Sequence, residues 1–244
     1  MAKTAKIRLF VEAPLAKGQG IALNKDQSNY LFAVMRLSVG DQILVFNGQD
    51  GEWLADVLEA SKRNGTLGCV EQTAPLRLPP DLWLCFAPIK KERTHFIVEK
   101  AAELGAAYIQ PVITQFTNSE RLRTDRLQAH ALEAAEQCGG TFVPTVNDPV
   151  KFTDLLSNWP TDRQLMFCDE NREALPVAKA LAKASGDKWA IIIGPEGGFS
   201  PDEVATLRGL AQTTSVTLGP RILRADTAAV AALTAWQSAL GDWG

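Results

Sequence analysis

From residue 82 onward the chain alternates apolar runs with amphipathic stretches, and this alternation limits the possible folds more than any other feature. The apolar runs include "LWLCFAP" and "WAIIIG", which are typical of strands buried on both faces. Helical patterns lie between them, such as "RTHFIVEKAAELG", which Gly105 closes. The alternation predicts an α/β fold with a parallel or mostly parallel sheet covered by helices on both faces.

The same patterns set the expected order of elements in this half of the chain. Strands are expected at 82–88, 107–113, 141–146, 163–168, 189–194 and 215–219, and helices at 93–105, 125–138, 151–159, 172–185, from Pro201, and at 227–241.

The first part of the chain has a different pattern of apolar and turn-forming residues. From Ile7 to about Thr73, short strand-like runs are broken by turn signals such as Asn64-Gly65, and one helix is expected at roughly 26–36. This pattern predicts a small β-barrel over residues 1–73. The proline-rich stretch "APLRLPPD" then leads into a second domain, residues 74–244.

Three expected loops follow strands of the parallel sheet: "CDEN" (168–171), "GPEGGFS" (194–200) and "GPRILRAD" (219–226). Ligands of such sheets bind outside the carboxyl ends of the strands. The middle loop ends in Ser200-Pro201-Asp202-Glu203, which predicts a capping box with proline at the first helical position. Its glycines could serve only a tight turn, or they could allow a ligand to come close.

The middle loop does not have the chemistry of a phosphate site. It matches neither G-x-x-x-x-G-K-[ST] nor G-x-G-x-x-G, and Glu196 would repel an anion at the following helix N-terminus. An adenosine-bearing ligand that lacks phosphates and carries positive charge fits better. S-adenosylmethionine is the common ligand of that kind.

Composition excludes several other classes of protein. The net charge of −3 argues against a surface coated in basic residues, although residues 73–130 carry eight basic against six acidic groups. Four scattered cysteines and two distant histidines give no reason to expect a disulfide framework or a metal site. Neither a membrane span nor a signal peptide is expected, and we expect a cytoplasmic protein.

The motif "IIIGPEGGFSPDE", followed by "LGPRILRADTAAVAAL", resembles the signature of the RsmE family of 16S rRNA (uracil-N3) methyltransferases, which belong to the SPOUT class. "NYLFAVMRLSVGDQILVFNGQDGEWLADV", "FIVEKAAELGAAYIQPVIT" and "EAAEQC" also occur in the family's order. The resemblance implies a PUA-like barrel, then a SPOUT α/β domain with a deep trefoil knot. It also implies a homodimer that uses S-adenosylmethionine to methylate N3 of one uridine in 16S rRNA, on the assembled small ribosomal subunit.

The resemblance also assigns site residues, position by position. The cofactor-binding residues that it implies are Cys168, Gly194, Pro195, Glu196, Gly197, Gly198, Leu218, Gly219, Ile222, Leu223, Arg224, Thr227 and Ala228, with Cys168, Asp169 and Glu170 bordering the third loop. Candidates for phosphate contacts are Arg8, Arg36, Lys90, Lys91, Arg93, Arg121, Arg123 and Arg126. Each of these could equally be an ordinary surface charge, because a phosphate contact leaves no sequence signature.

Arg224 and Asp226 are the candidate catalytic residues. Arg224 would stabilise negative charge on the uracil, or it could instead form a salt bridge with Asp226 or Glu196. Asp226 could act as a base, orient a neighbour, or cap the last helix. The family usually has Glu at this position, and it tends to have Arg where this chain has Gly140.

Two other classes of function compete with the methyltransferase. An RNA-binding or ribosome-assembly protein without catalytic activity would use the barrel alone and would not bind S-adenosylmethionine. A doubly wound oxidoreductase would have G-x-G-x-x-G after its first strand, and the sequence lacks that motif there.

Overall fold

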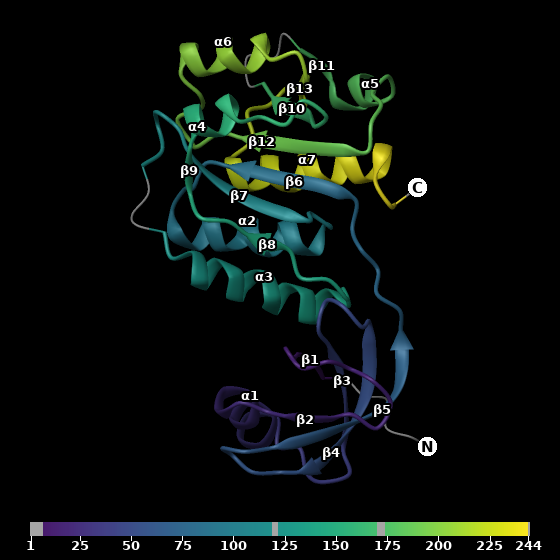
Figure 1. The fold of residues 1–244 in the computed structure, drawn as a ribbon. Coiled ribbons are helices and arrows are strands. Elements are labelled where there is room, and N and C mark those ends of the chain that lie inside the picture. The colour runs from purple at the N-terminus through teal and green to yellow at the C-terminus, as the bar shows by residue number, and fades with distance from the viewer. Residues whose placement is uncertain (1–6, 119–121, 170–173, 244) are drawn as a thin grey trace. The chain divides into compact units, whose positions relative to one another are not determined.

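A computed structural model of the chain describes residues 7–118, 122–169 and 174–243 (Figure 1). The chain divides into two compact units. The first contains Met1–Leu78 and Ala135–Val143, and the second contains Pro79–Ala134 and Pro144–Gly244. Arg121 and Glu170, two of the residues singled out from the sequence, lie outside the described residues. The functional domains 1–73 and 74–244 stay a proposal.

The first unit is built on a five-stranded sheet with the order β1-β3-β4-β5-β2. Its elements are β1 (Arg8–Phe10), β2 (Gly20–Ala22), α1 (Lys25–Asn29), η1 (Tyr30–Val34), β3 (Gln42–Phe46), β4 (Glu52–Glu59) and β5 (Thr66–Ala74). β1 pairs with β3 in parallel, and the other pairs are antiparallel. The small β-barrel expected over residues 1–73 is present as a five-stranded half-barrel sheet.

The helical segment between β2 and β3 differs from the expected helix over 26–36. Asn24 and Gln27 form a capping box that starts α1 at Lys25. The chain then widens into the π-helical turn η1, which places Leu31 in the core of the sheet. Arg36 follows with a φ of 59°, a left-handed conformation that is incompatible with a continuing helix.

The second unit contains the predicted parallel sheet, with the order β11-β13-β10-β12-β6-β7-β8 and with β9 paired to β7. All its strand pairs are parallel among the residues described. Its strands are β6 (Asp81–Phe86), β7 (Tyr108–Ile113), β8 (Thr145–Val146), β9 (Val150–Lys151), β10 (Gln164–Cys168), β11 (Leu175–Pro176), β12 (Lys188–Ile193) and β13 (Thr213–Thr217). Its helices are α2 (Lys91–Glu103), α3 (Thr124–Cys138), α4 (Phe152–Ser157), α5 (Val177–Leu181), α6 (Pro201–Gly209) and α7 (Ala225–Leu240).

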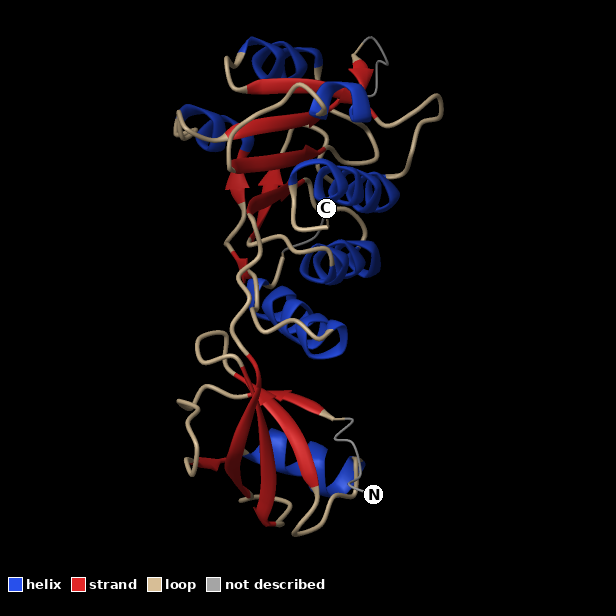
Figure 2. Cartoon of the chain, turned by 90° about the vertical axis from the view of Figure 1, so that its right-hand side faces the viewer, coloured by secondary structure: helices blue, strands red, loops and turns tan. Residues whose placement is uncertain are grey.

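Alternate residues of the central strands enter different cores, because side chains of a strand point to opposite faces. Ile191 and Ile193 pack in one core with α2, α3, α5 and α7, whereas Ile192 packs in the other with Phe152 of α4 and Leu207 of α6. Helices therefore cover both sides of the sheet (Figure 2). This double coverage explains why the strands are almost wholly apolar.

One expected helix is wrong in extent. The helix predicted over 172–185 is confined to α5 (Val177–Leu181), and it follows the short strand β11. Pro176 is the N-cap of α5, and a proline has no backbone N–H to donate to a longer helix at that point.

The trefoil knot stays a prediction. No helix in the described part of the chain is long and apolar enough to cross a membrane.

Candidate functional site

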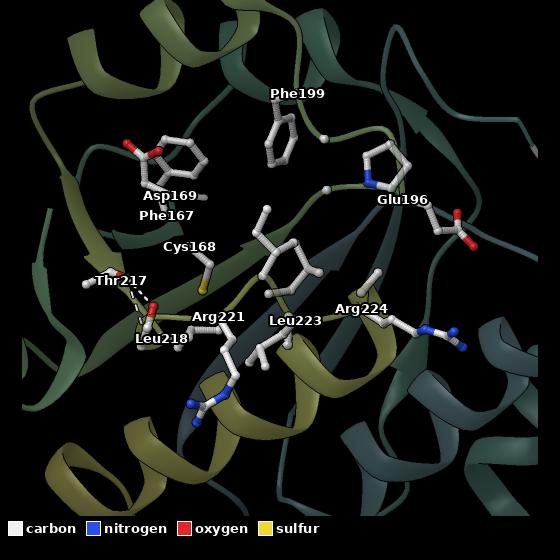
Figure 3. A pocket seen from close by; sticks show the side chains of 18 of the residues that line it. Phe167, Cys168, Asp169, Glu196, Phe199, Thr217, Leu218, Arg221, Leu223 and Arg224 are labelled. Carbon is white, nitrogen blue, oxygen red and sulfur yellow. Dashed lines mark hydrogen bonds between the residues drawn. The ribbon is translucent and has the colours of Figure 1, made fainter. Parts of the chain in front are cut away.

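Three loops at the carboxyl edge of the sheet surround one cavity. β13, β10 and β12 are neighbours, so the loops that follow them lie side by side at the same edge. They enclose a cavity of about 230 Å³ (Figure 3). These are the three loops that the sequence singled out.

The middle loop follows β12 and turns sharply into α6. Gly198 has a φ of 71°, and its backbone nitrogen donates to the Pro195 carbonyl over 2.9 Å. Ser200 accepts from the Glu203 nitrogen, and the Glu203 carboxylate accepts from the Ser200 nitrogen at 2.8 Å, which confirms the predicted capping box. The second Glu203 oxygen accepts from the backbone nitrogen of Gln115 at 2.8 Å. Glu203 therefore ties the loop after β12 to the turn after β7.

The other two loops complete the walls. After β13, Gly219 has a φ of 122°, and the chain then leads to Arg224, the N-cap of α7. At the end of β10, Cys168 faces the cavity, and burial raises the pKa of its thiol to about 12. The thiol is therefore neutral at physiological pH. The Asp169 carboxylate is buried and accepts from Arg208 Nε at 3.0 Å and Nη2 at 2.6 Å.

The structure brings most of the implied cofactor residues together. Cys168, Gly194, Pro195, Glu196, Gly198, Leu218, Gly219, Ile222, Leu223, Arg224 and Ala228 all line the cavity. Gly197 and Thr227 are not among its lining residues. A Cβ at Gly197 would instead meet the Cβ of Phe116 at 3.2 Å. The cofactor-binding role of the set stays a proposal.

Sequence reasoning placed Asp169 at the border of the site, but it missed several other residues of the cavity wall: Phe167, Ile193, Phe199, Val204, Thr217, Arg221 and Ala225. Ile193 and Thr217 are the last residues of their strands, and Ala225 is the first residue of α7. The carboxyl-end rule, applied to whole strand ends rather than to glycines alone, would have found Phe167, Ile193 and Thr217.

The two candidate catalytic residues have different surroundings. Arg224 is exposed at the cavity rim and has no ion pair with Glu196 or Asp226 in the described structure (Figure 3). The Asp226 carboxylate lies 3.7 Å from Arg93 Nε and accepts from the Thr227 nitrogen at 2.8 Å. Because Arg224 is the N-cap of α7, the capping role considered for Asp226 is wrong.

The arginine of the first strand is a structural residue. Arg8 donates to Glu52 at 2.7 Å and to the carbonyls of Ala135, Glu136 and Gly140 at 2.7–2.9 Å, all within the first unit. These bonds use four of the five N–H groups of a guanidinium. Arg8 is therefore poorly suited to the phosphate contact that the sequence suggested.

The remaining basic candidates separate into two places. Arg36 is exposed on the first unit. In the second unit, Lys90, Lys91, Arg123 and Arg126 line a second cavity, and Arg93 pairs with Asp226.

The first cavity suits an uncharged nucleoside better than a phosphate. Ile193, Leu218, Leu223 and Phe199 supply apolar walls, which match a flat base, and the glycines expose backbone groups that can bond its edge. Arg208 neutralises the buried Asp169. Glu196, Arg221 and Arg224 also line the cavity, so its apolar walls, rather than its charge, favour an uncharged base.

Comparisons with known proteins agree with this geometry. The family described as "RNA methyltransferase domain" matches residues 76–237, and the "RNA methyltransferase PUA domain" matches residues 23–67. Ribosomal RNA small subunit methyltransferase E of Rickettsia conorii is 31% identical over 228 residues, which cover 93% of each chain. The protein of the same name from Bacillus subtilis is 28% identical and covers 93% of this chain and 94% of its own.

Two solved structures share the whole fold. A methyltransferase from Legionella pneumophila, in complex with bound cofactor SAM, is 28% identical with a TM-score of 0.87 and covers 97% of this chain and 98% of its own. Ribosomal RNA small subunit methyltransferase E from Neisseria gonorrhoeae, bound to S-adenosyl methionine, is 27% identical with a TM-score of 0.87. It covers 98% of this chain and 99% of its own.

Proposed function

The chain belongs to the ribosomal RNA small subunit methyltransferase E family, and from this membership we propose that it methylates N3 of one uridine in 16S rRNA with S-adenosylmethionine. The observation that carries the proposal is the three-loop cavity at the carboxyl edge of the sheet. The residues of its walls fit the methyl donor, which when bound supplies an electrophilic methyl group on a sulfonium sulfur.

The reaction needs an accessible base and a deprotonated N3. As the N3–methyl bond forms, the sulfur–methyl bond breaks, and the N3 proton leaves to solvent or a base. N3 takes part in base pairing, so the uridine must be unpaired or flipped out before it can enter the site. Loss of the proton places negative charge on the two uracil carbonyl oxygens.

Arg224 is suited to stabilise that charge. Its guanidinium lies at the rim of the cavity, and Asp226 is engaged by Arg93 instead. A preorganised donor of this kind contributes about 10²–10³-fold to a rate. In this proposal Asp226 is a positioning residue, because its carboxylate lies 3.7 Å from Arg93 Nε at the start of α2.

The decisive experiment combines binding and product analysis. S-adenosylmethionine is titrated into the protein by calorimetry, and small ribosomal subunits from cells that lack the enzyme are then incubated with both. Mass spectrometry of the 16S rRNA should show one new N3-methyluridine. Tight cofactor binding without any methylated base would refute the uracil-N3 assignment. If no cofactor bound, the competing RNA-binding function without catalysis would be favoured.

We also propose a homodimer that acts in the cytoplasm. The resemblance supports the dimer, and Ile222 at the cavity rim is 70% exposed, as expected of an apolar side chain that a second copy covers. The ribosomal substrate supports the location. Light scattering that gives a mass near 26.5 kDa, that of a single chain, at micromolar concentration would contradict the dimer.

A further inference from the structure

A second cavity lies at the same edge of the sheet as the first. β6 pairs in parallel with β12, and Phe86 lies opposite Ile193. The Ala87 nitrogen donates to the Ile193 carbonyl at 2.9 Å, and the chain then continues to Lys90 at the start of α2. The segment after β6 therefore neighbours the cofactor loop. It also forms part of a cavity of about 600 Å³, here named the basic cavity.

The lining of the basic cavity is cationic. Lys90, Lys91, Arg123 and Arg126 line it together with His95, and among the residues that the structure describes none of the lining is a carboxylate. Arg123 is paired with Asp125, over 2.9 Å from Nε to Oδ1. The side chains of Lys90, Lys91 and Arg126 have no ion-pair partner within the described ranges. Cations gathered without partners on a concave surface favour an anionic ligand.

Two helices begin at this cavity and add to its positive potential. α2 starts at Lys91 after an N-cap that forms no side-chain hydrogen bond, and α3 starts at Thr124, between the lining residues Arg123 and Arg126. The N-terminus of a helix carries a partial positive charge and unpaired backbone N–H groups. The helix ends therefore act in the same direction as the side chains.

An ion pair lies next to lining residues of both cavities, and neither of its own members lines a cavity. Arg93 of α2 lies 3.7 Å from Asp226 of α7, two residues after Arg224. Thr94, the next residue, forms part of the cavity lining, and its hydroxyl bonds both the nitrogen and the carbonyl of Ile89 at 3.0 Å. A polyanion whose reacting base enters the first cavity would therefore pass over Arg93 into the second.

We propose that the basic cavity binds the sugar-phosphate backbone of the rRNA strand beside the target uridine. This inference rests on the proposed function and adds a defined site to it. The cavity is large enough for a nucleotide, since ligand pockets span roughly 300–1,000 Å³. An RNA strand fits better than a free nucleotide. The methyl donor carries no phosphate, so phosphate groups beside its site would come from the RNA substrate. The basic cavity opens at the same edge of the sheet as the donor's site. His95 stacks on His130 with ring centroids 4.1 Å apart and supplies a polar wall among the cations.

The test measures binding, so that it does not depend on methylation. The double variant Lys91→Gln/Arg126→Gln is compared with Lys179→Gln/Lys183→Gln, which removes two exposed lysines that line neither cavity. Affinity for small ribosomal subunits is measured from 50 to 300 mM salt. Each lost phosphate contact lowers the slope of log affinity against log salt by about 0.7 for single-stranded RNA. The cavity variant should therefore lose about 1.4 from the slope, and the control variant should keep the wild-type slope.

Three controls make the result decisive. The dissociation constant for S-adenosylmethionine should be unchanged in both variants, because neither pair lines the first cavity. Equal slopes in the cavity variant and the wild type would overturn the proposal, as would an equal loss of slope in the control variant.

Titration with uridine monophosphate distinguishes a free nucleotide from the RNA backbone as the source of phosphate. Micromolar binding that the cavity variant loses without any change in slope would make the cavity a free-nucleotide site and refute the RNA assignment. Absent methylation with the predicted slopes would instead refute the proposed function alone.

Discussion

Replacing Gly194 with alanine tests whether the shape of the cofactor loop is set by one aromatic ring. A Cβ at this position would lie 2.9 Å from Cε2 and 3.1 Å from Cδ2 of Phe199. The ring has little room to move, because it packs edge-on against Phe167 at 5.6 Å and lies 6.0 Å from Phe152. Overpacking of this kind costs about 1–3 kcal/mol. A cost of about 2 kcal/mol lowers the melting temperature by roughly 4–8 °C in a domain of this size.

The same cost should appear in cofactor affinity, because Gly194 and Phe199 both line the cavity. If the contact between the new Cβ and Phe199 strains the loop conformation that binds the cofactor, a cost of about 2 kcal/mol raises the dissociation constant of S-adenosylmethionine roughly 30-fold. Calorimetry and thermal melting measure the two effects. Gly209→Ala is the matched control, since a Cβ there meets no atom within 4 Å.

A compensating change tests whether steric strain against the ring is the cause of both effects. Phe199→Leu removes the ring edge that Gly194→Ala would contact, so the double variant should be more stable than the sum of the two single changes predicts. The expected coupling is about 1 kcal/mol or more, in the range found for residues in contact. Strict additivity, or an unchanged cofactor affinity in Gly194→Ala, would refute the reasoning.

Three further predictions address other parts of the site. Arg224→Ala should lower kcat about 10²–10³-fold and leave cofactor affinity unchanged; wild-type turnover on small ribosomal subunits would remove Arg224 from the mechanism. Glu203→Ala should cost about 2–4 kcal/mol in urea unfolding, because two charge-assisted bonds to backbone nitrogens are lost. A loss below about 0.5 kcal/mol, the scatter of ordinary surface changes, would show that the loop is held in another way. Iodoacetamide at pH 8 should alkylate the exposed Cys138 well before Cys168, whose thiol pKa is about 12. S-adenosylmethionine should slow any residual labelling of Cys168, as peptide mass spectrometry would show.

Local patterns were enough to predict much of the fold. The apolar runs gave the parallel sheet, and Ser200 with Glu203 gave the start of α6, because both signals depend on neighbouring residues alone. The assignment of Ile191 and Ile192 to opposite cores needed the structure, since two adjacent isoleucines look alike in a buried strand. The short α5 also needed it, because a favourable helical composition was overridden by Pro176.

The missed parts of the site depend on partners far away in the sequence. The partner of Asp169 could not be recognised, because its bond to Arg208 joins positions 39 apart. The link between Glu203 and Gln115 spans 88 positions. A capping glutamate is expected to bond the N-cap nitrogen, but nothing in the local pattern announces a second bond to another loop.

Two arginines show that the role of a charged residue depends on its surroundings in the structure. Arg8 and Arg224 were both candidates for contact with the substrate. Arg8 uses four N–H groups on partners within the first unit, and its guanidinium carbon lies 4.5 Å from the centre of the Phe46 ring. A guanidinium bound in this way can reach a phosphate only by breaking bonds that hold β1 in place. Arg224 is exposed at the rim of a cavity, and the nearby carboxylate of Asp226 is paired with Arg93. The hydrogen-bonding capacity that remains, rather than the presence of positive charge, therefore separates an arginine that can act on RNA from one that stabilises the fold.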